Sequence, residues 1–227
     1  MAAVGLQYAA AAQAGVYSRL ARFNLHANRS VTALVGMVLA GGRSVRFGGE
    51  KAAAELAGTP LLIWAARRLQ RTCSVVAANV RPGTQSEAIA RANGLPLLYD
   101  VPGDALGPLA GVKVGLIWAR DLGATTLAVS PCDVPLLPDD LFVRLGAAAG
   151  DGPAMAETSG GDQPLCALWP VTALPQVAAA LEGGAHPPTW RLLQTLGATR
   201  VRFADEPAFA NVNTRADLAA IAARVAQ

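Results

Sequence analysis

The chain has 227 residues, of which 52% are hydrophobic and 15% are charged, and its formal net charge is +3. This length suits one α/β domain with a sizeable core, and the composition is typical of a globular protein rather than a disordered one. The small net charge, without a block of basic residues, argues against a nucleic-acid partner, and no apolar run reaches the roughly 18–20 residues of a membrane span.

Three scattered cysteines, Cys73, Cys132 and Cys166, show no Cys-x-x-Cys spacing, and the chain has two histidines. This pattern favours a reducing compartment, for which we predict the cytoplasm, and disfavours a disulfide scaffold or a histidine-based metal centre. Residues 1–33 are rich in alanine and carry arginines but no acidic residue. They partly resemble a targeting segment but lack the layout of a signal peptide. We interpret 1–33 as a disordered or helical extension, or as an incorrectly chosen start, and place the domain at 34–227.

The first predicted strand, residues 34–40, runs directly into a loop with four glycines and three cations that ends at Lys51. Free N–H groups in such a loop form an anion-binding concavity, and Arg46 and Lys51 add full positive charges. The spacing excludes a Walker loop, because Glu50 separates Gly49 from Lys51, and it does not fit a dinucleotide fingerprint. A polyphosphate is the expected ligand; the alternative is a connecting loop with solvated charges. The backbone candidates for phosphate binding are Leu39, Ala40, Gly41 and Gly42.

Further elements follow in alternation along the chain. We predict a turn or short hairpin at 55–59, a helix capped by Thr59 with Pro60 in its first turn, and then alternating strands and helices. A Rossmann-like three-layer α/β/α sandwich with a mostly parallel sheet is therefore expected, as a single domain. The predicted strands are 74–79, 96–99 and 125–130, and the predicted helices are 85–93, 108–120 and 138–149.

The C-terminal third is less regular. Two strands, 154–157 and 165–169, are predicted around a turn at Gly160-Gly161, followed by helices at 171–181 and 189–196 and a strand at 200–203. Thr214 is expected to cap a final helix at 215–226, with Asp217 completing a capping box.

Ligands of open parallel sheets bind beyond the carboxyl ends of the strands, where Gly41, Asn79, Asp100 and Asp133 are predicted to converge. Asp133 follows Pro131-Cys132 at a strand end, and a carboxylate that faces a phosphate loop needs a cation beside it. Magnesium fits, because it takes one or two carboxylates together with phosphate oxygens; the alternative is an Asp that caps the next turn. Cys132 is interpreted as a packing residue, since no basic residue adjoins it.

Two further segments are candidates for ligand contact. Gly107, which opens the segment Gly-Pro-Leu-Ala-Gly, permits close approach of a ligand to the backbone, or simply begins a helix. Alternation places Asn211 and Asn213 on the same face of an extended segment, where both can bind one ligand.

These motifs, in this order from about residue 34 to the end, resemble those of the molybdenum cofactor guanylyltransferase family of nucleotidyltransferases. The shared strings are Leu-Ala-Gly-Gly-x-Ser-x-Arg-Phe-Gly, Gly-Pro-Leu-Ala-Gly, Pro-Cys-Asp-x-Pro and Asn-x-Asn-Thr. The resemblance implies that Asp133 holds magnesium, that Asp100 contacts guanine, and that Asn79 helps to bind the nucleotide. It also implies acceptor contacts for Gln163, Asn211 and Asn213, although Gln163 alone reads equally as a turn residue. The chain departs from the family pattern at two positions, with Glu50 for the usual Asp and Arg215 for the usual Pro.

The resemblance implies transfer of GMP from GTP to the molybdopterin form of the molybdenum cofactor, with release of pyrophosphate. Arg46, Lys51 and Asp133 are the predicted catalytic residues. The alternatives are a related molybdopterin or polyol cytidylyltransferase, or a non-catalytic GTP-binding or cofactor-carrier protein. The expected small-molecule partners are GTP and the molybdopterin cofactor. The expected protein partners are molybdenum insertion proteins and target molybdoenzymes or their chaperones. We expect the protein itself to be a monomer.

Overall fold

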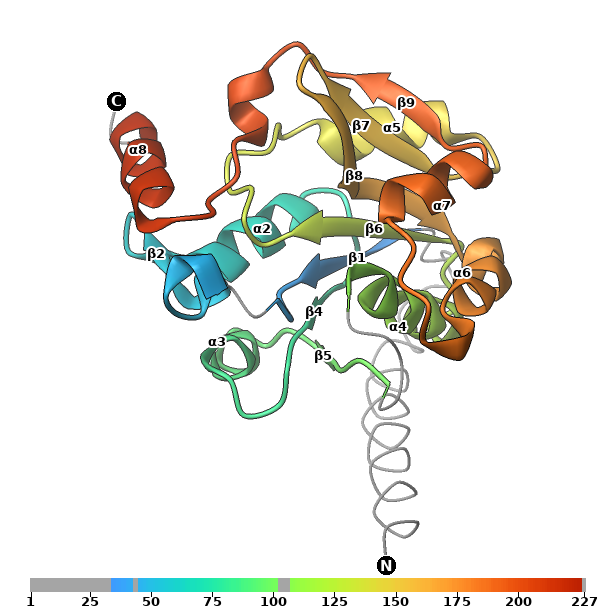
Figure 1. The fold of residues 1–227 in the computed structure, drawn as a ribbon, viewed down its shortest axis with the longest axis horizontal. Helices are drawn as coiled ribbons and strands as arrows, with labels where there is room; N and C mark the ends of the chain where they lie inside the picture. The colour runs from blue at the N-terminus through green and yellow to red at the C-terminus, as the bar shows by residue number, and fades with distance from the viewer. Residues whose placement is uncertain (1–33, 43–44, 102–106, 226–227) are drawn as a thin grey trace, which may run out of the picture. The chain divides into compact units, whose positions relative to one another are not determined.

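The computed structural model describes residues 34–42, 45–101 and 107–225. The predicted extension 1–33 lies outside these residues, so the domain boundary stays a prediction. A seven-stranded sheet with the strand order β5-β4-β1-β6-β8-β7-β9 forms the centre of the described fold, and a short hairpin forms a second sheet (Figure 1). The strands of the main sheet are β1 (Leu34–Leu39), β4 (Val76–Asn79), β5 (Leu97–Leu98), β6 (Thr126–Pro131), β7 (Ala154–Thr158), β8 (Gly161–Pro170) and β9 (Thr199–Arg202).

The sheet is mostly parallel, as predicted. Strand β1 pairs in parallel with β4 and β6, β4 pairs in parallel with β5, and β7 pairs in parallel with β9. The exception is β8, which runs antiparallel to both β6 and β7. Because β7 and β8 are joined only by Ser159 and Gly160, they form a hairpin, and a connection this short cannot return the chain for parallel pairing.

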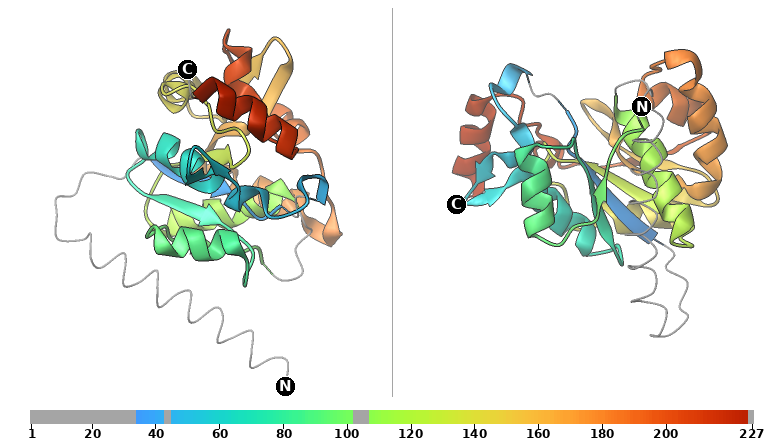
Figure 2. Two further views of the ribbon diagram at one scale, coloured as in Figure 1. Left: turned by 90° about the vertical axis from the view of Figure 1, so that its left-hand side faces the viewer. Right: turned by 90° about the horizontal axis from the view of Figure 1, so that it is seen from below.

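Helices cover both faces of the sheet, which confirms the three-layer prediction (Figures 1 and 2). On one face, α2 (Leu61–Gln70), α3 (Gln85–Ala92) and α5 (Leu141–Ala149) bury their apolar sides in one core cluster with Val38 and Ala128. On the other face lie α4 (Pro108–Asp121), α6 (Leu174–Ala180) and α7 (Thr189–Thr195). Residues of one strand alternate between these two cores, as expected for a sheet buried on both sides.

Helix α4 approaches the sheet very closely through two glycines. A Cβ atom on Gly111 would lie 2.6 Å from Cδ2 of Leu39 and 2.7 Å from Oδ1 of Asn79. One turn further, a Cβ on Gly115 would lie 2.8 Å from the side chain of Met37. Only glycine fits at such contacts, so these two positions set how near the helix lies to the ends of β1 and β4.

The C-terminal helix α8 (Arg215–Val225) packs beside the segment that follows β1 rather than against the main sheet (Figure 2). Its Ile221 joins a small core with Phe47 of η1 (Val45–Phe47) and Leu56 of the hairpin β2 (Glu55–Leu56) and β3 (Thr59–Pro60). The predicted capping box is present, because the Asp217 N–H donates to Oγ1 of Thr214 (3.2 Å) and the Thr214 N–H donates to Oδ2 of Asp217 (2.8 Å).

Three predicted helix starts are wrong, each for a local reason. Thr59 lies in β3, and Pro60 holds the capping position of α2 without a side-chain hydrogen bond. The helix predicted from residue 138 begins at Leu141, since the preceding residues form a turn in which the Leu141 N–H donates to the Pro138 carbonyl (3.2 Å). The helix predicted from residue 171 begins as the 3-10 turn η3 (Val171–Ala173), because a proline ring at position 175 clashes with a preceding α-helical turn.

Candidate active site

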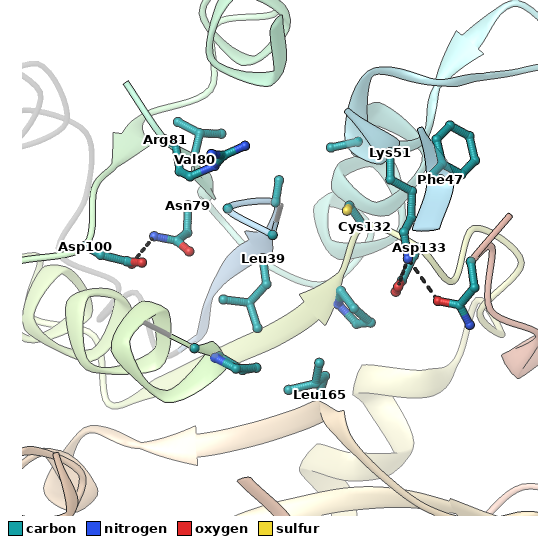
Figure 3. Close-up of a pocket in the computed structure, with 18 of the residues that line it drawn as sticks. Leu39, Phe47, Lys51, Asn79, Val80, Arg81, Asp100, Cys132, Asp133 and Leu165 are labelled. Carbon is teal, nitrogen blue, oxygen red and sulfur yellow. Dashed lines mark hydrogen bonds and ion pairs between the residues drawn. The ribbon is translucent and has the colours of Figure 1, made fainter. Parts of the chain in front are cut away.

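The ends of three parallel strands meet at one level and open a cavity. Leu39, the last residue of β1, lies opposite Asn79 of β4 on one side and opposite Pro131 of β6 on the other. The loops that follow these strands therefore leave the sheet together, as the sequence analysis expects. They line a cavity of about 770 Å³ (Figure 3).

At one end of the cavity, Lys51 joins two distant parts of the chain. Its Nζ donates to Oδ2 of Asp133 at 2.8 Å and to Oδ1 of Asn213 at 3.1 Å. The two charged side chains are 13% and 23% exposed, so this ion pair is partly shielded from water. The Lys51 ammonium is thus a cation beside Asp133, where magnesium is the cation predicted from the sequence.

The C-terminal segment positions Asn213 beside Lys51 and Asp133. The Val212 N–H donates to the backbone carbonyl of Asp133 (2.8 Å), and the Asn213 N–H donates to Oδ2 of Asp217 (2.9 Å). The backbone N–H groups of Asn213 and Thr214 lower the pKa of the Asp217 carboxyl, which keeps it ionised. The capping box of α8 thus positions Asn213, whose side chain accepts a hydrogen bond from Lys51.

At the other end of the cavity, Asn79 and Asp100 form a pair. The side chain of Asn79 is 3% exposed, and its Nδ2 donates to Oδ1 of Asp100 at 2.8 Å (Figure 3). The buried amide therefore orients the carboxylate, which lines the cavity. Gly107 also lines this cavity with φ +154°, a conformation that favours glycine at the start of α4.

Glu50, one of the two residues that depart from the family pattern, bridges the glycine loop to α3. Its carboxylate accepts hydrogen bonds from the N–H groups of Gln85 (3.0 Å) and Ser86 (2.9 Å) and from the Ser86 hydroxyl (2.7 Å). Burial raises the pKa of the Glu50 carboxyl, but the Ser86 and Gln85 hydrogen bonds and the charge of Arg81 outweigh it, so its pKa is lowered. Glu50 thus satisfies N-terminal N–H groups of the helix and anchors the residue before Lys51.

Cys132 lines the cavity with a buried thiol. Burial, followed by the negative charge of Asp133, raises the pKa of its thiol to about 12. The thiol therefore stays protonated near neutral pH, which agrees with its interpretation as a packing residue. Burial likewise raises the pKa of the Cys166 thiol, and all three cysteines are unpaired and buried.

The structure brings most of the predicted site residues together. Those that line the cavity are Leu39, Ala40, Gly41, Gly42, Arg46, Lys51, Asn79, Asp100, Gly107, Asp133 and Asn213. Gln163 and Asn211 do not line it. Gln163 lies on β8 opposite Ala156 of β7, and its Nε2 donates to Oγ1 of Thr158 (3.4 Å). Asn211 is exposed, since the chain leaves the turn η5 (Glu206–Phe209) and reaches the cavity only at Asn213.

Leu165 and Arg81 are among the residues that line the cavity and that sequence reasoning missed. Leu165 lies on β8, which pairs with β6 so that Ala167 is opposite Val129. The antiparallel direction of β8 therefore places Leu165 at the carboxyl edge of β6, which the sequence alone does not reveal. Arg81, in contrast, directly follows the Asn79 strand end, so the rule that found Asn79 could have found it.

Comparison with known proteins agrees with this geometry. The family model described as "MobA-like NTP transferase domain" matches residues 36–200. A molybdenum cofactor guanylyltransferase of Cereibacter sphaeroides is 41% identical over 189 residues, which cover 82% of this chain and 94% of the relative. One from Rhodobacter capsulatus is 39% identical over 201 residues, which cover 86% of this chain and 97% of the relative.

A solved structure gives the same fold. The molybdopterin-guanine dinucleotide biosynthesis protein A of Archaeoglobus fulgidus superposes with a TM-score of 0.69 at 21% identity, over 85% of this chain and 98% of that one. Among the described residues, no helix is long and apolar enough to cross a bilayer. The matched residues, the coverage of the relatives and the shared fold lead to one conclusion: the chain belongs to the MobA-like nucleotidyltransferase family, together with the molybdenum cofactor guanylyltransferases.

Proposed function

We propose that this protein transfers GMP from GTP to the molybdopterin form of the molybdenum cofactor, giving the guanine dinucleotide cofactor and pyrophosphate. The observation that carries the proposal is the group formed by Lys51, Asp133 and Asn213 at one end of the cavity, with the Asn79–Asp100 pair at the other. One end suits phosphates and the other suits a base. The names of the relatives, all molybdenum cofactor guanylyltransferases, support the choice of guanine and of the acceptor.

The Asp100 carboxylate matches the edge of guanine. Its oxygens can accept hydrogen bonds from both the ring N–H and the exocyclic amine of that base. Cytosine presents no adjacent ring N–H and amine of this kind, so a carboxylate held by Asn79 favours guanine. This supports GTP over CTP as the nucleotide.

The transfer needs no nucleophile from the protein. An oxygen of the acceptor phosphate attacks the α-phosphorus of GTP and forms the new P–O bond, while the bond from that phosphorus to the bridging oxygen breaks and pyrophosphate leaves. The acceptor phosphate is already anionic near neutral pH, so no protein base is required. The protein contributes positioning and charge: backbone N–H groups at Gly41 and Gly42, and the cations Arg46 and Lys51, stabilise the negative charge that develops.

Magnesium dependence is part of this proposal. The described residues contain no group of three or more His, Cys, Asp or Glu side chains that could hold a metal ion by themselves. Asp133 offers one partly exposed carboxylate on the cavity wall, and one carboxylate together with nucleotide phosphate oxygens is a donor set that Mg²⁺ takes. Bound there, the ion would neutralise phosphate charge; Asp133 would hold it, and Lys51 would then be free to bind a phosphate.

The test measures pyrophosphate release by purified protein with magnesium and the molybdopterin-form cofactor. We expect release with GTP but not with CTP, and loss of release in Asp133→Ala but not in Asp151→Ala, which removes an exposed carboxylate outside the cavity. Release with CTP alone would keep the mechanism and reject guanine. Tight GTP binding without release would favour a cofactor carrier. A monomeric state, a cytoplasmic location, and contacts with molybdenum insertion proteins and target molybdoenzymes or their chaperones stay predictions.

A further inference from the structure

The charges on the cavity wall are not balanced. Five charged side chains line it, namely Arg46, Lys51, Arg81, Asp100 and Asp133. Lys51 and Asp133 neutralise each other, and Asp100 accepts a hydrogen bond from Asn79. Because the Asn79 amide is uncharged, the three cations and two carboxylates leave a net charge of +1; the two guanidinium groups lie on the glycine loop and on the loop after β4.

Arg81 lies directly over the glycine loop. Its Cγ is 3.9 Å from the point where a Cβ on Gly41 would lie, and Oδ1 of Asn79 is 3.5 Å from the same point. Asn79 turns its amide nitrogen toward Asp100, so Arg81 shares the Gly41 side of Asn79 and not the Asp100 side. Figure 3 shows Arg81 and Asn79 on one side of the cavity and Lys51 and Asp133 on the other.

The Arg81 guanidinium makes no hydrogen bond or ion pair within the described part of the chain. Some surface arginines elsewhere are paired, since Arg200 contacts Asp162 at 2.8 Å and Arg91 contacts Glu87 at 2.8 Å. The nearby carboxylate of Glu50 is already bound by the N–H groups of α3. Arg81 is thus a partly buried fork of five donors beside an anion-binding loop, and its charge also acts on the carboxyl of Glu50.

We propose that Arg81 is a further substrate-binding residue, which contacts the triphosphate of the nucleotide from the β4 side, opposite Lys51. The proposal rests on the proposed function, since it takes a nucleoside triphosphate as the ligand. A guanidinium binds phosphate oxygens through two parallel N–H groups, and the Arg81 side chain lies beside Gly41 of the glycine loop. Together, Lys51 and Arg81 hold the phosphates between two cationic walls.

The experiment compares binding of GTP, CTP and guanosine to wild type, Arg81→Ala, Arg81→Lys and Arg67→Ala, by calorimetry for the nucleotides and NMR titration for guanosine. Arg67 is an exposed arginine on α2 outside the cavity and serves as the matched control. We expect Arg81→Ala to weaken the binding of GTP and the binding of CTP by the same factor. This factor should be about 10-fold to 100-fold, the range for loss of hydrogen bonds to charged groups. Guanosine binding should be unchanged, Arg81→Lys should be intermediate, and Arg67→Ala should equal wild type.

Two results would overturn the inference: GTP binding to Arg81→Ala that equals wild type, or an equal loss for guanosine and GTP, which would place Arg81 at the base or ribose. Unchanged guanosine binding also shows that the variant is folded. Failure of the proposed function has a different signature, namely a wild-type protein that prefers CTP to GTP. The Arg81 effect on both triphosphates would persist in that case.

Discussion

The two ends of the cavity are built in different ways. At the base end, Asn79 and Asp100 are 21 residues apart and come from neighbouring strands, since Asn79 pairs with Leu98 in the sheet. At the phosphate end, Lys51 meets Asp133 and Asn213, which are 82 and 162 residues away. Sheet register and the close approach of Gly111 position Asn79 in the first pair, whereas the contact of Lys51 with Asn213 in the second group needs the packing of the C-terminal segment near the glycine loop. We therefore expect changes at the base end to alter selectivity and changes at the phosphate end to alter turnover.

The largest effect is expected from removal of the Lys51 charge. Lys51→Ala should lower kcat about 10²-fold to 10³-fold, the range for loss of one preorganised group that stabilises developing charge. Lys51→Arg should restore only part of the rate, because a planar fork does not replace a compact ammonium between Asp133 and Asn213. Single-turnover measurements with saturating GTP would check this. A rate within 3-fold of wild type would remove Lys51 from the catalytic group.

The next largest effect is expected from a change of Asp100 at the base end of the cavity. Asp100→Asn should weaken GTP binding about 10-fold to 100-fold, since one acceptor for the guanine N–H groups becomes a donor. ITP, which lacks the 2-amino group, should lose less affinity than GTP. Titration of both nucleotides against wild type and variant gives the answer. An equal loss for both would mean that Asp100 does not read the exocyclic amine.

A smaller effect is expected from the Glu50 bridge between the glycine loop and α3. Glu50→Gln should lower turnover by about 10-fold, and should reduce the unfolding free energy by about 1 kcal/mol, as for loss of a helix-capping acceptor. Glu55→Gln, at an exposed position of the hairpin, is the matched control and should change neither. Denaturant unfolding and steady-state rates measure the two effects. If only stability falls, Glu50 supports the fold without positioning Lys51.

The Glu50 bridge should also depend on pH. Because hydrogen bonds lower the folded-state pKa below the ordinary value of 4.5, the ionised form is favoured by folding. The contribution to stability is complete above pH 4.5 and is lost as the pH falls through the lower, folded-state pKa. The stability difference between wild type and Glu50→Gln should therefore shrink in acid. A difference that grows below pH 4.5 would contradict this assignment.

The smallest effect is expected from the capping box of α8. Asp217→Ala removes the acceptor that holds the Asn213 and Thr214 N–H groups, so Asn213 should meet Lys51 less often. We expect a lower melting temperature and a loss of turnover smaller than that of Glu50→Gln. Thermal unfolding and kcat, measured beside Asp151→Ala, would test this. A loss as large as that of Lys51→Ala would show that the whole C-terminal segment detaches.

The sequence predicted the parallel half of the fold and the residues at its strand ends, because each depends on local patterns. The alternation around Leu39, Asn79 and Pro131 and the rule for strand ends lead directly to the cavity. Similarly, the spacing of Thr214 and Asp217 is a local signal for a cap, and the structure confirms it.

What the sequence could not reveal depends on pairing between distant segments. Leu165 lines the cavity and Gln163 does not, because the antiparallel register of β8 decides which of its residues reaches the cavity. No local pattern in the sequence encodes this register. The Lys51 contact with Asn213 depends on a core that includes Phe47 and Ile221 from opposite ends of the domain. The role of Glu50 required the position of α3, which lies beside the loop only after the sheet has formed.

Under the proposed function, Gly111 is expected to influence base selectivity although it does not line the cavity. Its missing side chain is the space that Oδ1 of Asn79 occupies, so Gly111→Ala would displace Asn79 and, with it, the carboxylate of Asp100. A mutant library restricted to cavity-lining positions would not vary Gly111. The position of Asn79 in every clone of that library would nevertheless depend on the glycine. Attempts to change the nucleotide preference by engineering should therefore vary Asp100 and Asn79 while keeping Gly111 fixed.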